Sequence, residues 1–108
     1  MKTLLTGAGG LVGSTINADV KVMGRKPPIL GYKGLGFREY TKRWCDLTSY
    51  RETYELFKQC KPTHVIHCAG RVGGLKANSE HLGEFFYENM MINLNVLESA
   101  RRAGVQKV

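Results

Sequence analysis

Three glycines at a regular spacing, Gly7, Gly10 and Gly13, constrain the fold of this chain more than any other feature. They follow the short apolar run from Lys2 to Thr6, which is typical of a buried first strand in a parallel sheet. They lead into residues 11–17, which are long enough for about two turns of helix. A strand, a glycine turn and a helix in this order predict the opening unit of an α/β fold.

The spacing of the glycines has a steric explanation that points to a phosphate ligand. The first permits a tight turn, the second lets a ligand approach the backbone, and the third lets the helix pack closely on the strand. Free amides and the helix dipole then face an anion such as the pyrophosphate of a dinucleotide. We therefore expect the cofactor to contact Gly7, Gly10, Leu11, Val12 and Gly13. A flexible turn without a ligand is the alternative, whereas Ser14 excludes a P-loop, which needs lysine there.

The rest of the chain predicts an incomplete parallel sheet with helices on both faces. The five strands are expected at residues 2–6, at 20–23, within 38–44, at 63–68 and from 105 onward. Two prolines and three glycines in residues 26–37 predict a loop, part of an atypical segment at 27–43. We expect one Rossmann-like α/β domain over residues 1–108, with strand order 3-2-1-4. Its fourth strand has an open edge, so we expect the isolated chain to self-associate.

Two further helices are predicted from their end signals. Ser49 and Glu52 form a capping box that opens a helix of about ten residues. Residues 84–103 predict a long helix that ends before Gly104. We expect the first of these helices to pack by an aromatic face made of Tyr50, Tyr54 and Phe57.

Composition excludes several classes of protein but leaves the ligand open. The chain has 108 residues, a formal net charge of +7 and an odd number of cysteines, which predicts reduced thiols. It contains neither a membrane-spanning apolar run nor the start of a signal peptide, so we expect a soluble cytoplasmic protein without membrane partners. The positive charge suits nucleic acid, a dinucleotide phosphate or an acidic nucleotide sugar, and charge alone does not distinguish these.

Basic residues after the predicted second strand favour NADP(H) over NAD. An NAD site carries an Asp or Glu there, which accepts a hydrogen bond from the ribose 2′-hydroxyl. The sequence instead reads Met23-Gly24-Arg25-Lys26, and a guanidinium suits a 2′-phosphate. We expect Arg25 to be the main contact and Lys26 to assist it, with a solvated basic loop as the alternative.

Three other patterns resemble catalytic or metal sites, and we assign none of them that role. Tyr54 and Lys58 match Tyr-x-x-x-Lys, but Tyr54 shares an apolar helical stripe, so we expect core packing. His64 and His67 are three residues apart on a strand and point to opposite faces, which disfavours a shared metal ion. Cys68 ends a strand and is expected to be a small packed residue rather than a nucleophile.

Five segments together carry a family resemblance. They are Gly7 to Ser14, Asp46-Leu47, Pro62 to Gly70, Val72-Gly73-Gly74 and Asn89 to Glu98. They resemble the N-terminal part of the GDP-L-fucose synthases, which belong to the extended short-chain dehydrogenase/reductase family, also called the NAD-dependent epimerases and dehydratases. The similarity covers residues 1–25 and 44–108.

The resemblance implies a function and a role for each segment. Complete members of the group convert GDP-4-keto-6-deoxymannose to GDP-L-fucose by epimerisation at two carbons and reduction of the keto group by NADPH. By resemblance, Asp46-Leu47 lies beside the adenine and Ala69-Gly70 passes the ribose and nicotinamide. Val72-Gly73-Gly74 would line the end of the site that takes the GDP-sugar substrate.

The chain also departs from the family. Its predicted first crossover helix is short, residues 27–43 look inserted or rebuilt, and the chain stops before the family's catalytic Ser, Cys, Tyr-x-x-x-Lys and His positions. We therefore expect no catalytic residue here and no turnover by this chain alone. Asn89, Asn93 and Asn95 either serve the network of the site or are polar positions on a half-buried helix. A non-catalytic dinucleotide-binding module and, less favoured, a small basic nucleic-acid-binding protein are the alternatives.

Overall fold

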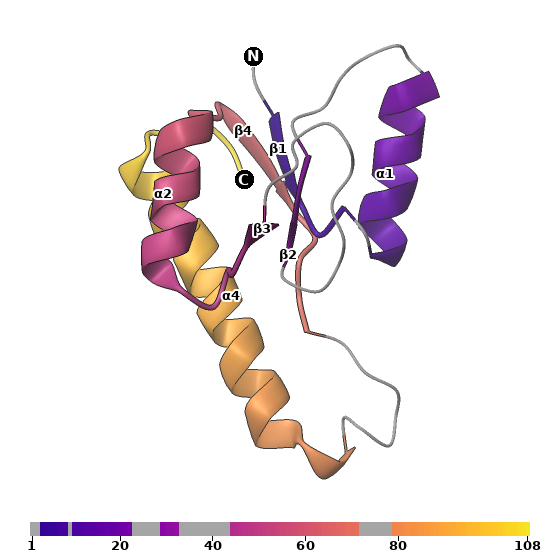
Figure 1. The fold of residues 1–108 in the computed structure, drawn as a ribbon, viewed down its shortest axis with the longest axis vertical. Coiled ribbons are helices and arrows are strands. Elements are labelled where there is room, and N and C mark those ends of the chain that lie inside the picture. Colours follow the sequence, from indigo (N-terminus) through magenta and orange to yellow (C-terminus); the bar gives the residue numbers. More distant parts are fainter. Residues whose placement is uncertain (1–2, 9, 23–28, 33–43, 72–78) are drawn as a thin grey trace.

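Four strands and three helices follow one another along the described part of the chain, as Figure 1 shows. The computed structural model describes residues 3–8, 10–22, 29–32, 44–71 and 79–108, with the backbone alone described at 17–22, 29–32 and 44. The elements are β1 (Thr3–Thr6), α1 (Leu11–Val22), β2 (Ile29–Tyr32), β3 (Trp44–Cys45), α2 (Tyr50–Cys60), β4 (His64–His67) and α4 (Leu82–Arg102). Within these ranges, no helix is both long and apolar enough to cross a membrane.

The strands form a parallel sheet in the order β3-β2-β1-β4. In its register, Thr6 at the end of β1 lies beside Leu30 of β2 and His67 of β4. The predicted strand order 3-2-1-4 is therefore confirmed. Because the strands are parallel, their carboxyl ends meet at one edge of the sheet.

The end of the chain starts to pair with the outer edge of β4. His64 and Lys107 form a parallel bridge, and the Val65 amide donates to the Lys107 carbonyl at 2.9 Å. The predicted start of a fifth strand is confirmed by this pairing. It covers the first half of the β4 edge that the sequence suggested would be open.

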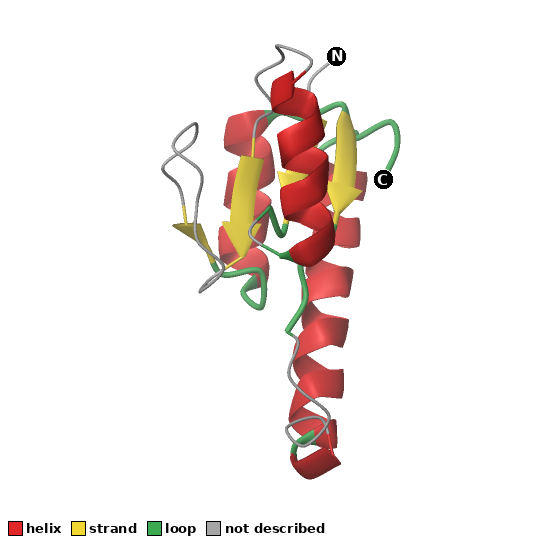
Figure 2. Cartoon of the chain, turned by 90° about the vertical axis from the view of Figure 1, so that its right-hand side faces the viewer, coloured by secondary structure: helices red, strands yellow, loops and turns green. Residues whose placement is uncertain are grey.

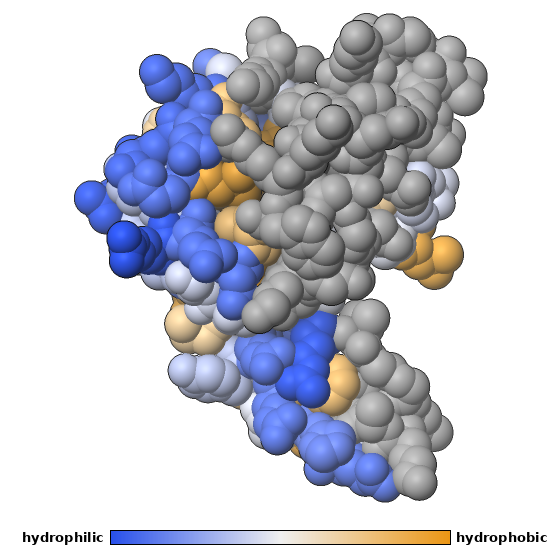
Figure 3. Space-filling view, viewed as in Figure 1, coloured by the Kyte–Doolittle hydropathy of each residue, from blue (hydrophilic) through white to orange (hydrophobic). Residues whose placement is uncertain are grey.

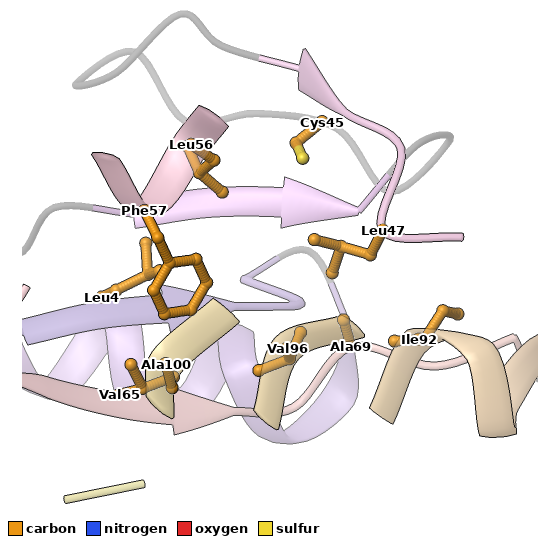
Figure 4. Packing of buried hydrophobic residues seen from close by; sticks show 10 residues of the cluster. All are labelled: Leu4, Cys45, Leu47, Leu56, Phe57, Val65, Ala69, Ile92, Val96 and Ala100. Atoms are coloured by element: carbon orange, nitrogen blue, oxygen red, sulfur yellow. The ribbon is translucent and has the colours of Figure 1, made fainter. Parts of the chain in front are cut away.

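Helices cover both faces of the sheet, with α1 on one side and α2 and α4 on the other (Figure 2). Alternation along β1 explains the two layers, because Leu4 joins the core under α2 and α4 whereas Leu5 packs with Ile16 of α1. The larger core is shown in Figure 4. It contains Leu4, Cys45, Leu47, Leu56, Phe57, Val65, Ala69, Ile92, Val96 and Ala100.

The prediction of the second strand was wrong. Residues 20–22 form the last turn of α1, which has 12 residues, and β2 lies at Ile29–Tyr32 inside the predicted loop. An alternating Val-Lys-Val run is too short to distinguish helix from strand, and valine lowers helix propensity only slightly. Pro27-Pro28 directly precede β2 in the sequence, where proline is compatible with the first part of a strand. The crossover helix is thus not short.

The helix end signals were read correctly. Ser49 Oγ accepts from the Glu52 amide, and the Glu52 carboxylate accepts from the Asp46 amide at 2.9 Å rather than from Ser49. At the end of α4, Gly104 adopts φ +74°, and the Val105 amide donates to the Ala100 carbonyl at 2.9 Å. This is a Schellman motif, which satisfies carbonyls that the helix leaves free.

The aromatic face predicted for α2 was only partly right. The buried residues of α2 are Thr53, Leu56 and Phe57. Tyr50 and Tyr54 are half-buried, and their rings stack with the ring centres 5.9 Å apart. The Arg102 guanidinium lies 4.5 Å from the Tyr54 ring, so the tyrosines join α2 to α4 outside the core. The outward face of α2 is mainly hydrophilic (Figure 3).

Candidate dinucleotide-binding site

The glycine turn is built by close backbone contacts at two of its three glycines. Gly7 has φ +70°, and a Cβ there would stand 2.5 Å from the Cys68 carbonyl carbon and 2.6 Å from the Ala69 nitrogen. A Cβ on Gly13 would overlap the carbonyl oxygen of Gly7. Gly10 differs, because the nearest atom to its Cβ position is 3.4 Å away. Packing therefore excludes a side chain at Gly7 and Gly13, whereas a Cβ at Gly10 would be in ordinary contact with Gly7.

Helix α1 begins at this turn with free backbone donors. The Gly10 amide donates to the Gly7 carbonyl at 3.0 Å, and the Ser14 amide donates to the Gly10 carbonyl at 2.9 Å. The amides between these two bonds belong to Leu11, Val12 and Gly13. Helix geometry leaves them without an intrahelical acceptor, and the first turn of α1 holds no acidic residue. The positive end of the α1 dipole is therefore available to an anion.

Three of the predicted site segments share one edge of the sheet. Gly7 follows β1, Asp46-Leu47 follow β3, and Ala69-Gly70 come after β4. Because these strands are parallel, all three segments lie at their carboxyl ends. This edge is where ligands bind in open α/β sheets.

Asp46 and Leu47 have limited freedom to contact a ligand. Asp46 Oδ1 accepts from the Thr48 amide at 3.0 Å and from the Thr48 hydroxyl at 2.6 Å. Leu47 is 1% exposed, and its carbonyl accepts from Asn95 Nδ2 at 2.9 Å. Leu47 thus places its side chain in the core, and Asp46 retains Oδ2 for a ligand.

The segment after β4 is tied to β1 and to α4. Thr6 Oγ1 accepts from the amides of Cys68 and Ala69, at 3.1 and 3.2 Å. Asn89 Oδ1 accepts from the Arg71 amide at 2.7 Å, and Asn89 Nδ2 donates to the Arg71 carbonyl at 2.9 Å. Asn89 and Asn95 therefore bond to backbone groups, one of the two roles that the sequence left open. Asn93 instead bonds to the His67 ring. The sequence patterns did not identify Thr6 as a residue of the site. Its position directly before the first glycine of the turn could have indicated it.

Arg71 is held by the first turns of α4. Its guanidinium lies 3.0 Å from Glu88 Oε1, 3.6 Å from Glu84 Oε2 and 4.6 Å from the centre of the Phe85 ring. Its charge is balanced by these carboxylates, so Arg71 anchors the chain rather than presenting a free cation. The anchor lies immediately before Val72-Gly73-Gly74, which are outside the described residues.

The predicted 2′-phosphate contacts also lie outside the described residues. Arg25 and Lys26 come before β2 begins at Ile29. The argument for them required a position after the second strand, so the reason for choosing these two residues no longer holds. Such a position would instead follow Tyr32.

The other reactive side chains are engaged in packing or in local pairs. Lys58 is paired with Glu55 at 2.5 Å and lies 5.3 Å from the Tyr54 ring centre. Burial raises the pKa of the Cys45 thiol to about 12 and also raises the pKa of Cys68, so both thiols stay protonated at neutral pH. No group of three or more His, Cys, Asp or Glu in the described part of the chain is placed to hold a metal ion.

A parallel sheet of order 3-2-1-4, with a glycine turn opening a helix at its carboxyl edge, defines a Rossmann-type nucleotide-binding fold. The sequence profile of the NAD dependent epimerase/dehydratase family matches residues 3–108. The chain belongs to this family. The predicted fold class and family resemblance are thereby confirmed.

Several other proteins are similar to this chain over most of its length. GDP-L-fucose synthase from Dictyostelium discoideum is 40% identical over 104 residues, which are 96% of this chain and 30% of that protein. A GDP-L-fucose synthetase from Naegleria fowleri bound to NADP has a TM-score of 0.73 at 32% identity, over 95% of this chain and 30% of that one. UDP-glucose 4-epimerase from Thermus thermophilus, in complex with NAD, has a TM-score of 0.79 at 31% identity, over 97% of this chain and 35% of that one. The chain thus spans about a third of the length of these proteins.

Proposed function

We propose that residues 1–108 form the N-terminal part of the cofactor domain of a nucleotide-sugar epimerase/reductase similar to GDP-L-fucose synthase, and that they bind NADP(H). The observation that carries this proposal is the uncrowded Gly10, where a Cβ would meet the Gly7 carbonyl oxygen at an ordinary contact distance of 3.4 Å, beside the amides of Leu11, Val12 and Gly13 at the start of α1. The fold requires Gly7 and Gly13 to lack side chains, whereas the described residues leave room for a Cβ at Gly10 at ordinary contact distance. A pyrophosphate there would accept hydrogen bonds from the start of α1.

The remaining contacts follow from the shared edge of the sheet. Ala69-Gly70 run beside the turn, where they would border the ribose and nicotinamide, and Asp46-Leu47 follow β3, where they would border the adenine. Leu11 and Val12 are 88% and 60% exposed, which leaves their apolar side chains free to pack against the ligand. In the complete enzyme, Val72-Gly73-Gly74 would face the GDP-sugar.

The preference for NADP(H) rests on relatives and on charge. The similar Naegleria protein was solved with NADP, and the similar Thermus epimerase with NAD, so the family accommodates both. After Tyr32 the sequence continues into Lys33 and reaches Arg38, and Glu39 is the single acidic residue before Asp46, against four basic residues. Basic residues after the second strand suit a 2′-phosphate.

Bound NADPH would supply a hydride to a keto-sugar, and this chain's contribution would be to hold and orient the dinucleotide. None of the described side chains is placed as a proton donor beside the glycine turn; Tyr54 and Lys58 lie on α2, away from it. We therefore expect the 108-residue chain to bind NADPH without turning over a GDP-keto-sugar.

Replacing Gly10 by valine tests the proposal. We expect Gly10→Val to weaken NADPH binding at least about tenfold, because the new side chain fills the phosphate position. Its free energy of unfolding should fall by only about 1 kcal/mol, because valine is a poorer N-cap than glycine. Fluorescence titration with NADPH and NADH gives the affinities, and urea unfolding gives the stability.

The matched control is Gly83→Val, the same substitution near the start of α4, where a Cβ meets nothing within 4 Å. It should bind NADPH like the unaltered chain. Unchanged NADPH affinity in Gly10→Val would show that no phosphate lies at the turn. Absence of NADPH binding by the unaltered chain, together with oligonucleotide binding that weakens steeply with salt, would favour the nucleic-acid alternative.

Self-association of the isolated chain is expected through α4. This helix exposes an apolar face along its length, made of Leu82, Phe86, Met90, Leu94 and Leu97. We propose that a second copy packs antiparallel on this face, because the acidic first turn of α4, with Glu84, would then meet the basic last turn, with Arg101 and Arg102.

The double variant Phe86→Glu, Leu94→Glu should shift the chain to monomer in light scattering after size-exclusion chromatography, because charge opposes burial of this face. Val108→Glu is the control, since it makes one apolar-to-glutamate change at an exposed residue outside α4 and should leave the dimer intact. A monomer before any substitution, or a dimer unaffected by the double variant, would contradict this assignment.

A further inference from the structure

A chain of side-chain hydrogen bonds runs from the glycine turn to α4. Thr6 Oγ1, at the end of β1, lies 2.7 Å from His67 Nδ1 at the end of β4. His67 Nε2 lies 2.9 Å from Asn93 Oδ1 on α4. The same Thr6 oxygen accepts from the Cys68 and Ala69 amides, so the histidine contacts the group that holds the segment after β4.

The donor and acceptor roles in this chain follow from counting protons. A hydroxyl has one proton and two lone pairs, and backbone amides only donate. The amides of Cys68 and Ala69 occupy both lone pairs of Thr6 Oγ1, so the Thr6 proton points to His67 Nδ1. Nδ1 is therefore the acceptor, and the ring proton is on Nε2, where it is donated to Asn93 Oδ1.

We propose that His67 is a positioning residue: as the neutral imidazole with its proton on Nε2, it holds Thr6 as the acceptor that fixes Ala69-Gly70 against the Gly7 turn. Protonation of His67 would place a second donor on Nδ1, facing Thr6 Oγ1. Thr6 Oγ1 would then have three donors for two lone pairs, and the Ala69 amide would lose its partner, because the Cys68 amide also donates to the Thr6 carbonyl oxygen at 3.2 Å. The border of the dinucleotide site would loosen as a result, a consequence that rests on the proposed function.

The surroundings of His67 favour the neutral form. Burial lowers the pKa of His67 below its ordinary value of 6.5, and the hydrogen bond to Asn93 opposes this only in part. The groups that bond to its ring are Thr6 from β1 and Asn93 from α4, and both are uncharged. No charged side chain in the described ranges contributes to the lowered pKa.

The sign of the pH dependence follows from the lowered pKa. Above the ordinary value of 6.5, His67 is neutral in both the folded and unfolded chain, and its contribution to stability is complete. Below that value the unfolded chain takes up a proton that the folded chain resists. Between 6.5 and the lower native pKa, His67 therefore reduces the folding equilibrium constant by up to about tenfold per pH unit.

The test reads the tautomer and the amides directly, without ligand. Long-range proton–nitrogen correlation spectra of the labelled 108-residue chain should show His67 with an unprotonated Nδ1 and a protonated Nε2 near pH 8. As the pH falls below 6.5 and His67 takes up a proton, hydrogen exchange at the Ala69 amide should lose about fivefold to tenfold in protection, corresponding to one lost hydrogen bond. NADPH affinity should weaken over the same pH range.

Three variants separate positioning from simple packing. Asn93→Asp puts a carboxylate beside Nε2 on an exposed part of α4, so it should raise the His67 pKa and move the loss of protection to higher pH. Thr6→Ser keeps the hydroxyl and should retain the pH profile. His64→Gln, on the same strand, removes a histidine whose ring bonds to its neighbour Thr63, and it should leave the profile unchanged.

A proton on Nδ1 in the neutral state would overturn the proposal, as would amide protection that does not follow the titration of His67. An unchanged pH profile in Asn93→Asp would do the same. If the tautomer and the amides behave as expected but NADPH does not bind at any pH, the proposed function fails while the positioning role of His67 stands.

Discussion

Alanine at Gly7 or at Gly13 should lower the free energy of unfolding by about 3 kcal/mol or more, enough to leave much of the chain unfolded. At Gly7 the new Cβ would stand 2.5 Å from the Cys68 backbone, and the residue would also be held at φ +70°. At Gly13 the Cβ would overlap the Gly7 carbonyl oxygen. These neighbours are backbone atoms that belong to the sheet and the turn, so they cannot move aside as a flexible side chain would. Urea unfolding followed by circular dichroism measures the loss.

Two other glycines separate steric overlap from backbone strain. Gly104 has φ +74° but nothing within 4 Å of its Cβ position, so Gly104→Ala should cost only about 1 kcal/mol. Gly83 has neither a positive φ nor a neighbour within 4 Å, and Gly83→Ala should be neutral or stabilise α4 by up to about 1 kcal/mol. Equal losses at Gly13 and Gly83 would show that the close approach of α1 to β1 is not what excludes a side chain.

Phe57→Ala should destabilise the chain by about 3 to 5 kcal/mol. Phe57 is fully buried, and it lies among Leu4, Val65 and Ala100 in the core between α2, α4 and the sheet (Figure 4). Removing its ring leaves a cavity lined by strands and by both helices, which cannot close without moving them. Thermal and urea unfolding both report the change.

Tyr54→Ala, one turn away on α2, is the matched control. Tyr54 is half-buried, and its partners are the Tyr50 ring at 5.9 Å and the Arg102 guanidinium at 4.5 Å. Losing these contacts should cost about 1 kcal/mol. A loss as large as that of Phe57→Ala would mean that the tyrosines belong to the core, as the aromatic stripe in the sequence suggested.

Local signals were reliable where a residue type meets a specific backbone requirement. Ser49 caps α2, Gly104 ends α4 in a left-handed conformation, and the glycine turn joins β1 to α1. Periodicity failed at residues 20–23, because a few alternating residues fit a helix end as well as a strand. Because the second strand was predicted too early in the sequence, Arg25 was expected to follow it and to contact the cofactor there. In the structure Arg25 precedes β2.

The sequence by itself determined the class of fold, the glycine turn and the family, because these depend on residue types at fixed local spacing. Only the tertiary structure decided that Gly10 differs from Gly7, since the backbone that crowds Gly7 belongs to the segment after β4, far along the chain. It likewise joined Thr6, His67 and Asn93, which lie on three separate elements. Contacts between distant segments arise from the packing of the sheet against its helices, and no local pattern encodes them.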